Sequence, residues 1–186
     1  MLMKVLKMFR KKPVVNPHKN QPCYDEYGRF LGWYSRSVAC VMFVFCKDSS
    51  GEWCVLGCER GAGAADNNFL WNVPCGYLDF NETTYDCAVR ECLEETGILV
   101  DRKYLSFVGF QDEPTENRQN VSFRYAAIIN DKTTSDFKFS KVLNESDEVG
   151  EIKWIKMSDL HKYGWAFGHD KRIMEVFNFN LAAAKL

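Results

Sequence analysis

The sequence predicts an α/β sandwich, a fold in which helices cover a β-sheet. Apolar runs of strand length alternate along the chain with segments of helical periodicity, and this order is typical of packed α/β layers. The 186 residues, of which 46% are hydrophobic, suffice for one domain with a buried core. Because the chain also lacks internal repeats and low-complexity tracts, we expect one ordinary globular domain rather than a repeat protein or a disordered chain.

Basic residues are concentrated at the N-terminus. Residues 1–20 carry six basic side chains and no acid, which leaves 18 basic and 25 acidic residues in the remainder. Three of the five prolines, Pro13, Pro17 and Pro22, mark a hinge. We therefore interpret residues 1–22 as a basic arm with a proline-rich hinge and residues 23–186 as the folded domain. The acidic remainder argues against a broad nucleic-acid-binding surface.

The eight cysteines lie between positions 23 and 92 and include no CxxC pair. Several stand in apolar runs such as CVMFVFC, where a reduced cysteine packs as a small hydrophobic residue. This pattern predicts free thiols in a cytoplasmic protein and argues against a disulfide framework or a zinc ribbon. The sequence shows neither a signal-peptide core nor an apolar run of about 18 residues, so we expect no transmembrane segment.

Five segments have the length and the residue types of strands. They cover residues 38–46, 52–60, 104–110, 121–129 and 151–157. The tetrapeptide DSSG joins the first two, which predicts a hairpin or two adjacent strands, and QDEPTENRQN separates the third from the fourth. We expect the glycine-rich residues 61–75 to form a loop.

Two helices are predicted. Thr83 can cap the first, with Asp86 three residues later, and Gly97 can end it. Apolar residues recur between them at helical spacing and are expected to face the core: Tyr85, Ala88, Val89, Cys92 and Leu93. The second helix is expected over residues 169–184, with Ile173, Met174, Val176 and Phe177 on its buried side.

Three acids of the first helix, Glu91, Glu94 and Glu95, fall within one turn. They occupy an arc of about 100° beside the apolar stripe, where their carboxylates can share one hard divalent cation such as Mg²⁺. Arg90 lies one turn before Glu94 and can hold it by a charge-assisted hydrogen bond. The alternative is a solvated acidic face with interleaved lysines, but residues 76–98 contain no lysine.

The same segment resembles the Nudix box. The matching positions are Gly76, Glu82, Arg90, Glu91, Cys92, Glu94, Glu95, Gly97 and Ile98. The resemblance implies a Nudix-type α/β/α sandwich with a mixed β-sheet, and a divalent-metal-dependent pyrophosphohydrolase that uses Mg²⁺, with Mn²⁺ as a substitute. Cys92 stands where the family more often has an aliphatic residue.

The resemblance also implies roles for the residues of the box. Glu91 and Glu95 resemble the main metal ligands, Glu94 an assisting ligand, and Glu82 a ligand or a partner of one. Arg90 resembles the residue that orients these acids. The main-chain oxygen of Cys75, just before the box glycine, resembles a further metal ligand.

A general base and the substrate contacts must come from outside the box. Family members often draw the base from a later loop, and Glu148 is our choice within LNESDEVGE, although Glu145, Asp147 and Glu151 stay open. Arg60 and Arg118 lie on predicted loops where they can meet phosphate. Trp71, Phe69 and Phe110 are candidates to stack on a base, with core packing as the alternative for each aromatic ring. We assign no role to the histidines.

Pro114 lies sixteen residues after Ile98, and this spacing is similar to that of the ADP-ribose pyrophosphatase group. The resemblance implies ADP-ribose or a related nucleotide sugar as the substrate, and by analogy a homodimer. Hydrolysis of a nucleoside triphosphate stays open, as does a nucleotide-sensing module without activity. All four box glutamates are present, which favours an enzyme over a sensor.

Overall fold

A computed structural model describes residues 20–114, 119–140 and 147–183. The chain forms two compact units, Met1–Arg36 and Ser37–Leu186, which we describe separately. Most of the predicted basic arm lies outside the described residues, so its boundary after residue 22 stays a prediction. Arg118 and Glu145 also lie outside them.

The described part of the first unit is an antiparallel hairpin that the sequence did not lead us to predict. It consists of β1 (Gln21–Tyr24) and β2 (Phe30–Tyr34). Asp25 closes its turn by accepting hydrogen bonds from the backbone N–H groups of Tyr27 (2.9 Å) and Arg29 (2.8 Å). The strands are short and rich in exposed aromatic side chains. They therefore lack the alternation of apolar and polar residues that identifies a strand in sequence.

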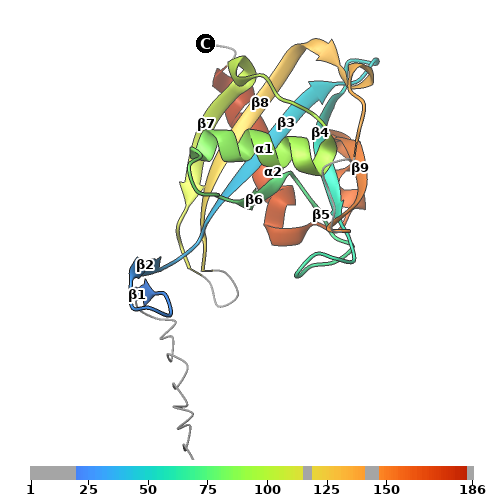
Figure 1. Cartoon of the computed structure of the whole chain (residues 1–186). Coiled ribbons are helices and arrows are strands. Elements are labelled where there is room, and N and C mark those ends of the chain that lie inside the picture. The colour runs from blue at the N-terminus through green and yellow to red at the C-terminus, as the bar shows by residue number, and fades with distance from the viewer. Residues whose placement is uncertain (1–19, 115–118, 141–146, 184–186) are drawn as a thin grey trace, which may run out of the picture. The chain divides into compact units, whose positions relative to one another are not determined.

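Seven strands of the second unit's described residues form one mixed sheet (Figure 1). They are β3 (Val38–Lys47), β4 (Trp53–Arg60), β5 (Trp71–Asn72), β6 (Cys75–Tyr77), β7 (Leu105–Gln111), β8 (Val121–Thr133) and β9 (Val149–Lys156). Their order is β5-β4-β3-β8-β7, with β6 paired to β3 and β9 to β4. Only the pair β3–β8 is parallel among these strand pairs. The mixed sheet that the sequence predicted is therefore confirmed.

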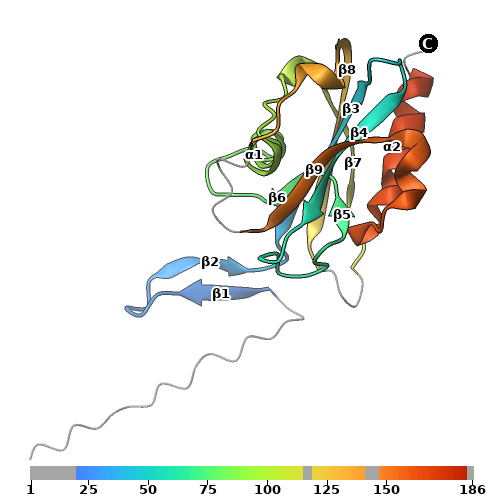
Figure 2. The same ribbon diagram turned by 90° about the vertical axis from the view of Figure 1, so that its right-hand side faces the viewer.

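Helices α1 (Thr84–Thr96) and α2 (His169–Ala183) cover opposite faces of this sheet (Figure 2). The side chains of β3 alternate between two cores, as the period of two in a strand requires. Cys40, Met42 and Val44 belong to the core under α1, and Val41, Phe43 and Phe45 to the core under α2. All six are buried. A strand buried on both faces explains why this segment reads as a continuous apolar run.

Helix α1 begins and ends as predicted. The side chain of Thr83 accepts a hydrogen bond from the N–H of Asp86, and Gly97 adopts the left-handed conformation with φ 75° while its N–H donates to Leu93 O. The buried residues are Cys87, Ala88, Cys92 and Thr96. Leu93 is only half-buried, so the buried stripe is rotated slightly from the one the sequence predicted.

We expect the Thr83→Ala variant to lower the free energy of unfolding by about 1 kcal/mol, because it leaves a backbone N–H of the first turn without its cap. Urea denaturation followed by circular dichroism measures this change. Thr83→Ser keeps the hydroxyl group and serves as the control, with stability near that of the wild type. Equal stability of the alanine and serine variants would contradict a role for the cap.

Several predicted elements need correction. The segment expected to be a loop, residues 61–75, contains β5 and the start of β6, because its last residues pair with β4 and β3. A short 3₁₀ helix, Arg102–Tyr104, precedes β7. In α2 Met174 is 42% exposed, so its predicted burial was wrong, whereas Ile173, Val176 and Phe177 are buried.

All eight cysteines are free, as the sequence predicted. Five of the described thiols are completely buried: Cys40, Cys46, Cys58, Cys87 and Cys92. They pack as small hydrophobic residues between the sheet and α1. No described helix is both long and apolar enough to cross a membrane.

Candidate active site

Strand β6 brings the box glycine against the acids of α1. Cys75 pairs with Val41 of β3, and Gly76 pairs with Cys40. Val41 faces α2 and Cys40 faces α1, and residues paired across two strands share a face. The Cys75 side chain is therefore directed to the α2 side and Gly76 to the α1 side.

Gly76 allows a close approach of Glu91. A Cβ atom at position 76 would lie 2.1 Å from Cδ of Glu91 and 2.2 Å from both carboxylate oxygens, which no real structure tolerates. Gly76 is not among the glycines with positive φ. The glycine is thus required for space rather than for backbone conformation, and the acid lies directly against the strand.

Arg90 links three acids of the segment. Its guanidinium group donates to both oxygens of Glu82 (3.0 and 2.7 Å), to Glu91 Oε1 (2.7 Å) and to Glu94 Oε2 (3.0 Å). It also donates to the main-chain oxygen of Tyr77 (3.0 Å). These contacts lower the pKa of Glu82 to about 2 and raise the pKa of Arg90. The structure thus contains the Arg90–Glu94 ion pair that the sequence suggested.

Glu91 and Glu95 have a different environment. Burial raises the pKa of Glu91, and nearby Arg90 opposes this shift. Burial, followed by the charge of Glu91, raises the pKa of Glu95 well above its ordinary value. Glu95 is half-buried, and its Oε2 accepts one long hydrogen bond, 3.3 Å, from the N–H of Cys75. Two crowded carboxylates whose ionised forms are disfavoured would be stabilised by a cation.

These residues fit a hard divalent cation in their chemistry. Glu91 and Glu95 offer carboxylate oxygens as ligands. Because residue 76 has no side chain, the carboxylate of Glu91 occupies the space beside it. Among the described residues, no three histidine, cysteine, aspartate or glutamate side chains are arranged as a ready-made metal-binding group. Arg90 holds Glu82 and Glu94 instead. The ligand set, including the Cys75 carbonyl, stays a prediction.

Cys75 is unsuited to act as a nucleophile. Burial, together with the charge of Glu95, raises the pKa of its thiol to about 12, and only the thiolate is a strong nucleophile. Its Sγ accepts a hydrogen bond from Asn72 Nδ2 at 3.3 Å. The thiol is therefore neutral at physiological pH.

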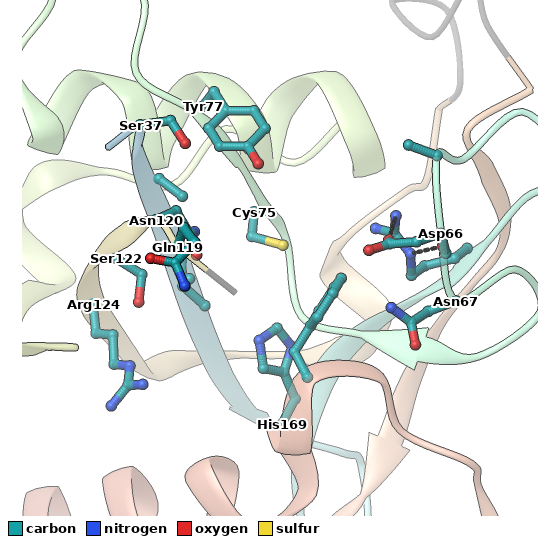
Figure 3. Close-up of a pocket in the computed structure, with 16 residues that line it drawn as sticks. Ser37, Asp66, Asn67, Cys75, Tyr77, Gln119, Asn120, Ser122, Arg124 and His169 are labelled. Atoms are coloured by element: carbon teal, nitrogen blue, oxygen red, sulfur yellow. Dashed lines mark hydrogen bonds and ion pairs between the residues drawn. The ribbon is translucent and has the colours of Figure 1, made fainter. Parts of the chain in front are cut away.

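A cavity of about 580 Å³ lies on the α2 side of β6. Its lining includes Arg60, Cys75, Gly76, Arg124, Phe167 and His169. In Figure 3, Gln119, Asn120, Ser122 and Arg124 lie on one side of the cavity and Asp66 and Asn67 on the other, with Cys75 and His169 between them. Because Cys75 and Gly76 line the cavity and also contact the acids, the cavity adjoins the candidate metal site.

Arg60 is the predicted substrate contact that the structure brings to this cavity. It donates to the main-chain oxygen of Asp66 (2.9 Å) and to Asp66 Oδ1 (2.8 Å), and it lies 5.0 Å from the ring centroid of Phe167. Its charge opposes the rise in the pKa of both Cys75 and Glu95, which burial dominates. Arg60 is thus held at the cavity by Asp66, close enough for its charge to act on Glu95.

Of the three aromatic rings suggested to stack on a base, Phe69 is 67% exposed and does not line the cavity, and the other two lie elsewhere. Trp71 is 7% exposed and packs in the core under α2, 5.1 Å from the ring of Tyr163. Phe110 is 58% exposed on β7 and packs against Phe123. Neither ring lines the cavity. For Trp71 the alternative of core packing therefore describes the structure, and the substrate contact that we predicted for it is corrected.

Glu148 lies beside the loop that follows β4. Its main-chain oxygen accepts a hydrogen bond from Gly61 N–H (2.7 Å), and Asp147 O accepts one from Gly63 N–H (2.9 Å). The Glu148 side chain is exposed, and its charge is one of those that raise the pKa of Glu95. Glu151 instead accepts a hydrogen bond from Lys153 Nζ at 2.7 Å. Glu148 therefore remains a candidate base.

The sequence did not lead us to several residues of the cavity. His169 is buried, and its Nδ1 accepts a hydrogen bond from Val73 N–H at 3.2 Å. Phe167 has a positive φ of 59°, which is unusual for a bulky residue and costs conformational energy. Ser122 and Arg124 were detectable in principle, since polar residues two apart in an apolar strand share a face.

The family comparison agrees with this geometry. A family model described as the NUDIX domain matches residues 35–176. This range covers most of the chain, including β3 to β9, α1 and the beginning of α2.

Solved structures with this fold include three informative neighbours. A MutT/nudix family protein from Enterococcus faecalis has a TM-score of 0.63 at 19% identity over 80% of this chain and 63% of its own. The NUDIX domain of Shewanella oneidensis NrtR, crystallised with ADP ribose, has a TM-score of 0.63 at 17% identity over 83% of this chain and 92% of its own. A C. elegans Ap4A hydrolase has a TM-score of 0.56 at 17% identity over 78% and 98%. At these identities the likeness concerns the fold.

Proposed function

Because this chain belongs to the Nudix family of pyrophosphohydrolases, we propose that it hydrolyses the pyrophosphate bond of a nucleoside diphosphate linked to another group, with ADP-ribose or a related nucleotide sugar as its substrate. One observation carries the proposal. Glu91 lies directly against Gly76, and Glu95 accepts a hydrogen bond from Cys75, while both of these β6 residues line the cavity. One strand, β6, therefore lies between a ligand in the cavity and the carboxylates of Glu91 and Glu95.

The protein groups have distinct tasks in this proposal. Glu91 and Glu95 hold the divalent cation, and Arg90 fixes the orientation of Glu82, Glu91 and Glu94. When bound, Mg²⁺, or Mn²⁺ in its place, neutralises the diphosphate and lowers the pKa of a water molecule. Arg60 binds a phosphate oxygen, because its guanidinium group lines the cavity and its charge acts on Glu95.

Two features support a nucleotide sugar. The cavity volume of about 580 Å³ lies within the range of small-molecule sites, which is roughly 300–1,000 Å³. Its lining combines the aromatic ring of Phe167 and the imidazole of His169 with hydroxyl, amide and guanidinium groups, as a ligand with a base and a sugar requires. The NUDIX domain of NrtR, which shares the fold, was crystallised with ADP ribose.

Free cysteines agree with a cytoplasmic location, which we also propose.

Mass spectrometry of products formed in ¹⁸O-labelled water tests the proposal. ADP-ribose, NADH, nucleotide sugars, Ap4A and nucleoside triphosphates are each incubated with the full chain and Mg²⁺. We expect cleavage of ADP-ribose or a nucleotide sugar with one ¹⁸O atom on one of the two phosphate products. Preferred cleavage of a triphosphate would replace our substrate with the alternative, and binding of ADP-ribose without turnover would indicate a sensor.

The Glu148→Gln variant tests the general base. We expect kcat to fall by about a hundredfold or more, because general base catalysis contributes roughly 10²–10⁴ in rate. The Mg²⁺ concentration for half-maximal activity should change little, since Glu148 is exposed and lies outside the Arg90 network. Asp147→Asn is the matched control. If kcat is unchanged in Glu148→Gln but falls in Asp147→Asn, Asp147 rather than Glu148 is the general base.

A further inference from the structure

The hairpin of the first unit, β1 and β2, exposes most of its large side chains (Figure 2). Tyr24, Phe30 and Trp33 have exposed fractions of 58%, 56% and 65%. Their rings contact one another edge to face, with centroids 5.9 Å apart for Tyr24 and Phe30 and 6.2 Å apart for Phe30 and Trp33. We call these three residues the aromatic cluster. A two-stranded sheet has no second layer of its own to cover such a cluster, and an exposed apolar patch marks an interaction surface.

Positive charge is concentrated directly before this hairpin in the chain. Residues 1–20 carry six basic side chains and no acid, whereas the remainder of the chain holds 18 basic and 25 acidic residues. The hairpin itself adds little charge, because the carboxylate of Asp25 accepts a hydrogen bond from Arg29 Nε at 2.6 Å. The basic stretch and the aromatic cluster belong to the same unit, Met1–Arg36. This unit therefore suits a negatively charged partner that also accepts apolar rings.

The composition of the basic stretch indicates what kind of partner this is. Large apolar residues stand between its first basic residues: Met1, Leu2, Met3, Val5, Leu6, Met8 and Phe9. Apolar side chains at intervals of three and four residues, with lysines between them, are typical of segments that bind at a membrane interface. A nucleic acid would attract the basic residues through its phosphates but would leave the aliphatic side chains in water. A lipid surface offers both anionic headgroups and an apolar layer beneath them.

We propose that the first unit attaches this protein to an anionic lipid surface, with the aromatic cluster at the depth of the headgroups and the basic residues of positions 1–20 against the lipid phosphates. Tryptophan and tyrosine rings favour this depth because one end of each ring system is apolar and the other is polar. Polybasic segments are attracted to anionic leaflets. The inference is independent of the proposed function, since it uses residues of the first unit alone.

Co-sedimentation of the full chain with sucrose-loaded vesicles tests the proposal. One set of vesicles consists of phosphatidylcholine, and the other of equal parts of phosphatidylcholine and phosphatidylglycerol. We expect the partition coefficient for the anionic vesicles to be larger by about tenfold or more. The difference should shrink as salt is added, because ions screen the attraction. Equal binding to the two sets of vesicles, or binding to neither, would overturn the proposal.

The double variant Lys11→Gln, Lys12→Gln tests the contribution of charge. Each basic residue near an anionic surface accounts for about a fivefold change in partition coefficient, so we expect a loss of roughly 25-fold. The matched control is Lys138→Gln, Lys171→Gln, which removes two exposed lysines of the second unit and should bind as the wild type does. Equal losses in the two double variants would show that binding follows net charge alone, which contradicts a site in the first unit.

Trp33→Ala tests the aromatic cluster. We expect a further loss of about tenfold, as removal of a large apolar side chain from lipid implies, whereas Trp33→Phe should keep most of the binding. Phe80→Ala removes a ring of the second unit that is 97% exposed and serves as the control. Circular dichroism shows whether each variant is folded. Wild-type binding by Trp33→Ala would overturn the proposal.

Fluorescence gives a second measurement at the same residue. The emission of the wild type minus that of Trp33→Phe isolates the signal of Trp33 from the four other tryptophans. We expect this difference spectrum to shift to shorter wavelength when anionic vesicles are added, because the indole ring leaves water. An unchanged spectrum with vesicle-bound protein would place the ring outside the lipid and contradict the proposal.

Two further assays identify a different partner if the lipid assignment is wrong. Single-stranded RNA that binds as tightly as the anionic vesicles, and loses affinity in both Trp33→Ala and the Lys11, Lys12 double variant, would assign the surface to nucleic acid. Analytical ultracentrifugation without lipid tests for a second copy of the chain. A dimer that dissociates in Trp33→Ala would assign the aromatic cluster to a protein interface. Either result would overturn the attachment to lipid.

Discussion

Glu95→Gln is expected to reduce hydrolysis by more than about a hundredfold. Glu95 is a predicted metal ligand, and loss even of a group behind a ligand costs roughly 10–100-fold in metal affinity or activity. Glutamine keeps the shape of the side chain and the hydrogen bond from Cys75 but removes the charge. Initial rates over a range of Mg²⁺ concentrations measure the effect. Glu94→Gln on the same helix should lose less, since Glu94 is more exposed and is held by Arg90.

The same variant should be more stable than the wild type when metal is removed. Burial and the charge of Glu91 raise the pKa of Glu95 well above its ordinary value of 4.5. The neutral carboxyl group therefore stabilises the folded protein fully below pH 4.5. This stabilisation is lost as the pH rises through the raised pKa, because the folded protein must then hold a buried charge. Glutamine stays neutral, and its thermal midpoint in EDTA at pH 7 should exceed that of the wild type. Added Mg²⁺ should then stabilise the wild type but not the variant.

An exposed glutamate of the first unit, Glu26, provides the control. Glu26→Gln should match the wild type in rate, in metal response and in thermal midpoint. Turnover by a folded Glu95→Gln protein at the rate of the wild type would refute the assignment of the metal ligand.

Gly76→Ala is expected to have the second largest effect on activity, about a hundredfold, because a displacement of 1 Å in a catalytic group has this cost. The added methyl group would lie 2.1–2.2 Å from the carboxylate of Glu91, so the acid must move away from β6. Its hydrogen bond to Arg90 at 2.7 Å would be disturbed as well. We expect the fall in kcat/KM to be accompanied by weaker activation by Mg²⁺.

Gly164→Ala is the matched control, because its added Cβ meets only a flexible side-chain end, Leu70 Cδ2, at 3.1 Å. It should keep most of the activity. Circular dichroism and thermal melting show whether the Gly76→Ala protein is still folded. They thereby distinguish a loss of activity caused by displacement of Glu91 from one caused by unfolding. Wild-type kinetics in a folded Gly76→Ala protein would show that the close approach has no role in catalysis.

The sequence was most informative where one physical requirement determines the residue. The cap at Thr83 and the left-handed end at Gly97 each depend on local chemistry, and the structure contains both. The crowding of Glu91, Glu94 and Glu95 was also visible, since helical geometry places such residues side by side. The family model over residues 35–176 confirms the family that these residues indicated.

The cavity could not be predicted in the same way, because its residues come together only through long-range packing. Arg60, Arg124 and His169 belong to β4, β8 and α2, and no local pattern relates them. Trp71 shows the converse difficulty. A tryptophan before the box suggested a ligand contact, but the pairing of β5 with β4 directs its ring into the core under α2. Met174 likewise has helical spacing for burial yet lies at the edge of the covered face.

The placement of α1 and the cavity on opposite faces has an evolutionary consequence. In the part of the chain that the structure describes, the short strand β6 contacts the acids of α1 and also lines the cavity. Under the proposed function, substitutions among cavity residues outside β6 would change which ligand is recognised while leaving the acids of α1 in place.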